Sequence, residues 1–156
     1  MRGEKFGWPL SSILLGLSGT ILIAVGCYFL FLRPALLPED IRYMNLSSAE
    51  LQSLGPRLST WLTHVFRVMG GYMIATGVLA LTVAVTAFRQ RSAWALAGAT
   101  VAGLVSIGWM TAVNFTINSE FKWVLLGFAL IWAASIAVFA VEARRADTSS
   151  PAGDVR

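Results

Sequence analysis

The residues whose types and spacing suit binding chemistry lie at the borders of long apolar segments. His64 and Arg67 are three residues apart and would share one face of a helix. Asn114 and Asn118 are four residues apart and would share a face of a second helix, with Glu120 soon after it. An arginine guanidinium presents a planar fork of donors to carboxylates and phosphates. These five residues therefore form a candidate polar cluster for a lipid-like or anionic small molecule.

Two acids, Glu39 and Asp40, are predicted on the same side of the membrane as this cluster and are its candidate partners. Arg67 would pair with Glu120 or with Asp40, or present its guanidinium to an anionic group. Three interpretations stay open. The cluster is an interface anchor, in which an arginine at a helix end extends its charge to water, or a structural polar network, or a ligand site.

Catalytic patterns are weak. Gly16–Gly19 has the Gly-x-Ser-Gly pattern of a rhomboid protease, and His64 would be the base. Ser18 is predicted near the middle of the first span, however, and His64 beyond the edge of the second. A nucleophile and its base must lie roughly 3 Å apart. We therefore expect these small residues to pack helices, and we predict no catalytic residue and no enzyme activity.

The chain has one cysteine, Cys27, and one histidine, His64. An intramolecular disulfide and a site built from several histidines are excluded within one chain, so neither a metal nor a cofactor is predicted. The residues before Cys27 resemble a degenerate bacterial lipoprotein box, but the sequence after it is still apolar, which favours an ordinary helix residue. No acid lies within the long apolar stretches 6–32, 68–88, 92–119 and 123–141, which argues against proton-coupled carboxylate transport.

Four apolar segments must position these residues. The predicted spans cover about 8–32, 62–88, 92–115 and 121–142, and roughly 20 apolar residues of helix cross the hydrocarbon of a bilayer. The sequence thus predicts an all-α integral membrane four-helix bundle. It would form a single domain over residues 1–145, followed by a disordered C-terminal tail over 146–156.

Composition supports this class. Hydrophobic residues make up 56% of the chain and charged residues only 13%, against about a quarter charged in soluble domains. The net charge of +4 comes from cations that flank the spans, without a cluster typical of nucleic-acid binding. The expected partners are the lipid bilayer and a membrane protein or further copies of this chain, with no nucleic acid.

Cation placement predicts the orientation. The shortest loop carries Arg89 and Arg91 without an acid, and Arg144 and Arg145 follow the last span. The cations on the other side are mixed with acids. We therefore predict a multi-pass protein of the bacterial inner membrane with both termini in the cytoplasm.

The long loop after the first span carries helix signals. Pro34 and Pro38 are predicted to end the first helix. Ser47 and Glu50 fit a capping box that would begin a short amphipathic helix over about 48–54, with Leu51 and Leu54 facing the bilayer surface or the bundle.

Small residues at intervals of four predict close helix contacts. Ala95, Ala99 and Gly103 form such a series on the third span, and Gly71 and Ala75 on the second. Whether these faces meet within the chain or between chains stays open at this point, with contacts within the chain favoured.

Four segments carry a resemblance: 37–44 (LPEDIRYM), 68–73 (VMGGYM), 109–115 (WMTAVNF) and 121–123 (FKW). Together they make the chain similar to small uncharacterised bacterial four-helix inner-membrane proteins over most of residues 10–142. The architecture is also similar to that of DoxX-like proteins, without a shared motif. The resemblance implies the fold and supplies no functional residue.

Overall fold

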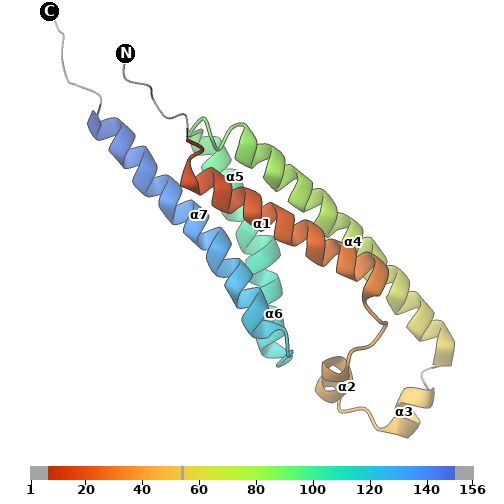
Figure 1. Ribbon diagram of the computed structural model, residues 1–156. Helices are drawn as coiled ribbons and strands as arrows, with labels where there is room; N and C mark the ends of the chain where they lie inside the picture. Colours follow the sequence, from red (N-terminus) through yellow and green to blue (C-terminus); the bar gives the residue numbers. More distant parts are fainter. Residues whose placement is uncertain (1–6, 54, 150–156) are drawn as a thin grey trace, which may run out of the picture.

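The structure is a computed structural model that describes residues 7–53 and 55–149. Within these ranges the chain is helical and contains no strand (Figure 1). Four helical segments are long and apolar enough to cross a membrane: Leu10–Leu32, Gly55–Val85, Ala93–Thr116 and Lys122–Ala146. The structure therefore contains four helical segments with the length and apolarity that the sequence predicts for the spans.

The first segment consists of α1 (Leu10–Cys27) and a π-helical turn, η1 (Tyr28–Leu32). It packs closely against α4 (Gly55–Val85) because glycines face each other at two levels. A Cβ atom on Gly77 would lie 2.6 Å from the carbonyl oxygen of Gly19, and one on Gly70 would lie 2.7 Å from that of Gly26. Only glycine permits this approach of the two backbones.

The third segment runs through α5 (Ala93–Gly103), the π-helical turn η2 (Leu104–Gly108) and α6 (Trp109–Thr116). It packs against α7 (Lys122–Ser149). The Trp132 indole covers Gly103, where an added Cβ would lie 2.0 Å from the ring, and its Nε1 donates to the carbonyl of Ala99 at 3.1 Å. The Ala99–Gly103 series thus makes its contact within the chain.

The second predicted series lies on a different face from the one that packs. Gly71 and Ala75 are exposed, and nothing lies within 4 Å of a Cβ added to Gly71. Gly70 and Gly77, seven residues apart, form the face of α4 that meets α1. The four-residue interval indicated that α4 packs through small residues, but not which face of α4 does so. Gly70 and Gly71 are adjacent in sequence and therefore lie on different faces of the helix.

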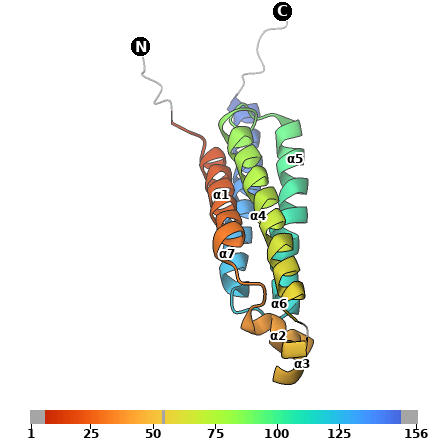
Figure 2. The same cartoon turned by 90° about the vertical axis from the view of Figure 1, so that its right-hand side faces the viewer.

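Contacts divide the helices into two pairs joined by α1 and α7. The first pair is α1 with α4, and the second is α5–η2–α6 with α7; α1 also packs along α7. Among the described residues, α4 has no contact of comparable extent with α5, η2 or α6. The helices lie side by side along one direction (Figure 2), and Phe88 and Phe139 pack in the buried core with ring centroids 4.5 Å apart.

The loop after η1 contains two short helices, α2 (Pro38–Met44) and α3 (Ser48–Ser53). Pro38 begins α2 instead of ending the first helix, since proline suits the first helical position. A helix does follow Ser47 as predicted. The Leu51 side chain and Leu54 lie outside the described part of the structure. The amphipathic orientation of this helix therefore stays a prediction. At the other end of the chain, α7 continues through 146–149, and 150–156 lie outside the described residues.

Candidate functional site

We call one end of the molecule the α2 end, because α2, α3 and the turn between α6 and α7 lie there (Figure 1). Asn118 and Glu120 belong to that turn, and Arg67 follows Phe66, whose ring lies against Arg33 beside α2. His64 and Arg67 are exposed on α4. In the part of the chain that the structure describes, neither side chain makes a hydrogen bond or ion pair to Asn114, Asn118 or Glu120. The structure therefore leaves the cluster as two separate groups.

The second group lies in α6 and in the turn that follows it. The Asn114 Nδ2 donates to the Met110 carbonyl, one turn back on the same helix, at 2.9 Å. Asn118 follows the helix with φ of 53°, a left-handed conformation that asparagine tolerates better than most residues. Its side-chain oxygen accepts a hydrogen bond from the Lys122 ammonium, and Glu120 is exposed.

Asp40 pairs with Arg33 rather than with Arg67. An Arg33 guanidinium nitrogen lies 3.1 Å from Asp40 Oδ2, and the Leu37 amide donates to the same oxygen at 2.9 Å. The latter bond satisfies a free donor at the start of α2. Asp40 thus both begins α2 and fixes it to the end of η1.

Arg33 is enclosed, with only 7% of its side chain exposed. Its guanidinium carbon lies 3.4 Å from the ring centroid of Phe66 and 5.3 Å from that of Phe29, which is cation–π geometry. Another guanidinium nitrogen donates to the Pro34 carbonyl at 3.0 Å. Arg33 therefore connects η1, α2 and α4 at a single point.

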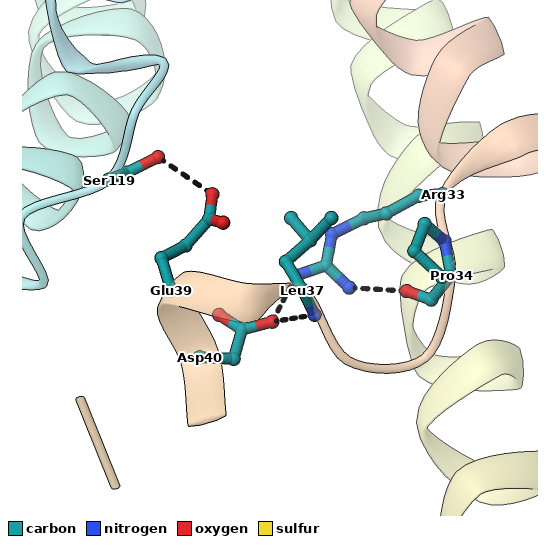
Figure 3. A network of polar contacts seen from close by, with 6 residues as sticks. All are labelled: Arg33, Pro34, Leu37, Glu39, Asp40 and Ser119. Atoms are coloured by element: carbon teal, nitrogen blue, oxygen red, sulfur yellow. Dashed lines mark hydrogen bonds and ion pairs between the residues drawn. The ribbon is translucent and has the colours of Figure 1, made fainter. Parts of the chain in front are cut away.

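Glu39 is the buried residue of α2, with 3% of its surface exposed. Its Oε1 accepts a hydrogen bond from the Ser119 hydroxyl at 3.1 Å. Ser119 is itself 1% exposed, and its oxygen accepts from the Phe121 amide at 3.2 Å. Figure 3 shows the two adjacent acids pointing in opposite directions, Glu39 toward the α6–α7 turn and Asp40 toward Arg33.

A second contact joins α2 to the same turn. The Arg42 guanidinium donates to the backbone carbonyl of Asn118 at 3.1 Å. The two contacts leave from the same side of α2, since Glu39 and Arg42 are three residues apart. The left-handed Asn118 and the buried Ser119 are thus both held by α2.

Sequence reasoning missed α2 and the role of Arg33. The signal for α2 was present, because proline followed by Glu39 and Asp40 is a typical helix start. No local pattern indicated Arg33, since its aromatic partner Phe66 lies on another helix.

A second carboxylate cluster, also missed, lies at the opposite end, which we call the terminal end. Glu142 of α7 accepts from the Ser11 hydroxyl at 2.6 Å, the Leu10 amide at 3.1 Å and an Arg91 guanidinium nitrogen at 3.0 Å. Its side chain is 19% exposed. These contacts join α7 to the start of α1 and to the turn between α4 and α5.

An apolar crevice runs between the two helix pairs. Its larger part, about 40 Å³, is lined by Leu22 of α1, Thr76 of α4, Ile107 of η2 and Trp132 of α7, among others. A smaller part of about 10 Å³ continues toward Val25 and Met110, and shares Ser18, Leu22 and Ile107 with the first. The crevice therefore extends along α1.

The hydroxyl groups that line this crevice offer it no free donor. Ser18 donates to the Leu14 carbonyl at 3.0 Å, Thr76 to that of Tyr72 at 2.8 Å, and Ser106 to that of Ala102 at 2.6 Å. Ser18 is thus used within its own helix and has no base beside it in the described structure. The crevice presents hydrocarbon surface.

No group of three or more His, Cys, Asp or Glu side chains within residues 7–53 and 55–149 is arranged to hold a metal ion. Cys27 is a half-buried free thiol on α1. Comparisons with protein-family models, with curated proteins and with solved structures found no match to this chain.

Proposed function

We propose that this chain is a multi-pass protein of the bacterial inner membrane, with cytoplasmic termini, that acts as a structural or interaction component. This proposal rests on the contacts that the enclosed charged side chains make. Arg33, Glu39, Asp40 and Glu142 are each engaged in contacts that join helices of the same chain. Such groups stabilise a particular arrangement of helices.

The apolar helix faces are consistent with assembly. Gly71, Gly98 and Gly127 lie on three different helices, and a Cβ added to any of them has open space around it. Small residues on lipid-facing surfaces permit close helix approach between chains. A component that works through interactions needs such faces, in addition to a stable internal arrangement.

Native mass spectrometry of the protein extracted in mild detergent tests this proposal. We expect an assembly of more than one chain, either copies of this protein or a stoichiometric membrane partner. A strict monomer without a partner, at a concentration where the protein stays folded, would contradict the proposal.

Leucine substitutions then identify the face used. Gly71→Leu, Gly98→Leu and Gly127→Leu add a side chain into open space and should leave the fold intact. One of them should dissociate the assembly, and the other two serve as matched controls. Gly77→Leu is the contrast, because it should disrupt the contact of α4 with α1.

The second candidate function is binding of an anionic or lipid-like ligand at the α2 end. The observation in its favour is that His64 and Arg67 are exposed basic side chains without a hydrogen bond or ion pair in the described structure. An anionic headgroup would pair with both. Phosphatidylglycerol retained by the protein should decrease on Arg67→Ala and His64→Ala, but not on Arg145→Ala, an exposed cation at the terminal end.

The predicted orientation has its own test. A reporter that is active only in the cytoplasm, fused after Arg145, should be active. Activity of a periplasm-specific reporter at that position would reverse the topology.

A further inference from the structure

The short helix α2 differs from the other helices in how it is attached. Its buried residue is an acid, Glu39, whereas Ile41 is only half-buried and Tyr43 and Met44 are 60% and 45% exposed. Apolar burial usually attaches a helix to its neighbours. Here polar contacts do so, and such contacts contribute little net free energy each because water can replace them.

These contacts connect the two helix pairs. Arg33 and Asp40 fix α2 to η1 and α4, which belong to the first pair. Glu39 and Arg42 fix it to Ser119 and Asn118, in the turn of the second pair. Figure 3 shows α2 between the two, with Arg33 on one side and Ser119 on the other.

Apart from α2, the two pairs meet mainly where α1 packs along α7. α4 packs on α1 and η1 without comparable contact to α5, η2 or α6 in the described ranges. The apolar crevice lies between the pairs and extends toward Val25 and Met110. A change in the separation of the pairs at the α2 end would change the width of this crevice.

We propose that α2 is a polar latch, formed by Glu39–Ser119 and Arg42–Asn118, whose release lets the helix pairs separate at the α2 end and widens the apolar crevice. The closed form is the one in this structure. A group that competes for Glu39 or for the Ser119 hydroxyl shifts the population toward the open form, since it binds that form alone. Opening would expose hydrocarbon surface suited to an apolar chain.

Distances between spin labels test the latch in the full chain, reconstituted in phosphatidylglycerol–phosphatidylcholine nanodiscs with Cys27→Ser to remove the native thiol. One label pair, at Tyr43 and Glu120, reports on α2 against the turn. A second pair, at Val68 and Val113, reports on α4 against α6. All four positions are exposed, so the labels should not disturb packing.

Glu39→Ala should at least double the width of the Tyr43–Glu120 distance distribution and shift it to longer distances. The Val68–Val113 distance should increase in the same variant. Glu39→Gln is the conservative control, because its amide oxygen still accepts the Ser119 hydroxyl, and both distributions should stay as in the parent.

Arg42→Ala covers the case in which Glu39→Ala does not fold. Arg42 is exposed, and the substitution removes the contact to Asn118 without leaving a buried group unpaired. We expect partial release, with a second, longer population in the Tyr43–Glu120 distribution. Unchanged distances in both folded variants, or a change confined to α2 with a constant Val68–Val113 distance, would overturn the proposal.

Discussion

At the terminal end Glu142 accepts hydrogen bonds from Ser11, from the Leu10 amide and from the charged Arg91, whereas at the α2 end Glu39 accepts from the neutral Ser119 hydroxyl. The first carboxylate is partly exposed and paired with a cation. The second is 3% exposed, and its hydrogen-bond partner in the described structure carries no charge. The Glu142–Arg91 contact adds the attraction between opposite charges to its hydrogen bond, which the neutral Ser119 hydroxyl cannot supply to Glu39.

The two ends therefore differ in how firmly their contacts hold the helices together. Glu142 joins three parts of the chain: the start of α1, the turn after α4, and α7. The α2 end adds a separate short helix between two helix pairs, and its contacts to the second pair, Glu39–Ser119 and Arg42–Asn118, each connect only two groups. We infer that the terminal end fixes the arrangement of the helices, while the α2 end is the place where it can change.

The largest effect should come from Glu142→Ala. The variant loses three contacts and leaves Arg91 without its carboxylate, which should cost about 2–3 kcal/mol of stability. The measurement is unfolding in mixed SDS micelles, with Glu39→Ala as the comparison at about 1 kcal/mol. A larger cost for Glu39→Ala would reverse the comparison of the two ends.

Arg33→Ala should rank next. It removes the ion pair with Asp40 and the stacking on Phe66, for about 1–2 kcal/mol. Arg33→Lys keeps the charge but not the planar stacking, and should recover about half of the loss. Arg67→Ala is the matched control, since its side chain is exposed and makes no hydrogen bond or ion pair in the described structure, and its effect should lie within about 0.5 kcal/mol.

Two residues in the left-handed conformation should give smaller changes in stability, of opposite sign, when each is replaced by glycine. Asn45 ends α2 with φ of 51°, and Arg91 has φ of 58°. Asn45→Gly should be neutral or stabilise by about 0.5 kcal/mol, because glycine adopts this conformation without a steric penalty. Arg91→Gly should still destabilise, since it loses the ion pair with Glu142. The same unfolding assay measures the stability of both variants. If both were more stable than the parent, the relief of the backbone conformation would outweigh the loss of the ion pair.

The smallest effect concerns Glu50, which is exposed at the start of α3. Hydrogen bonds from the side chain and backbone of Ser47 lower the pKa of Glu50 below its ordinary value. A depressed carboxyl pKa stabilises the folded state above the unfolded pKa, and this contribution is lost as the pH falls through the folded pKa. An NMR titration should give a midpoint for Glu50 below the ordinary value for a glutamate, and Ser47→Ala should raise it. An unchanged midpoint would show that the capping contact is absent in solution.

Helix positions followed from the sequence with small errors. The apolar runs place three of the four long segments within a few residues, because hydrocarbon thickness fixes the minimum length of a span. The second segment begins at Gly55, well before the predicted 62. The capping pair Ser47 and Glu50 identified the start of α3. Local chemistry suffices in these cases, since the interacting groups lie within one turn of each other.

The neighbours of the candidate site residues could not be predicted. Helical spacing cannot tell which helices become neighbours. Whether His64, Arg67, Asn114, Asn118 and Glu120 bind a ligand stays a prediction. Arg33 escaped notice because its partners Asp40 and Phe66 come from two other elements.

The sequence by itself determined the class of this protein: four apolar helical segments with their charges at the ends, since hydrophobicity and helix length are local properties. The tertiary structure decided which small residues meet, which acid is paired with a cation and which is buried against a serine. Those outcomes depend on the rotation of each helix about its axis, and adjacent residues such as Gly70 and Gly71, or Glu39 and Asp40, then point in different directions.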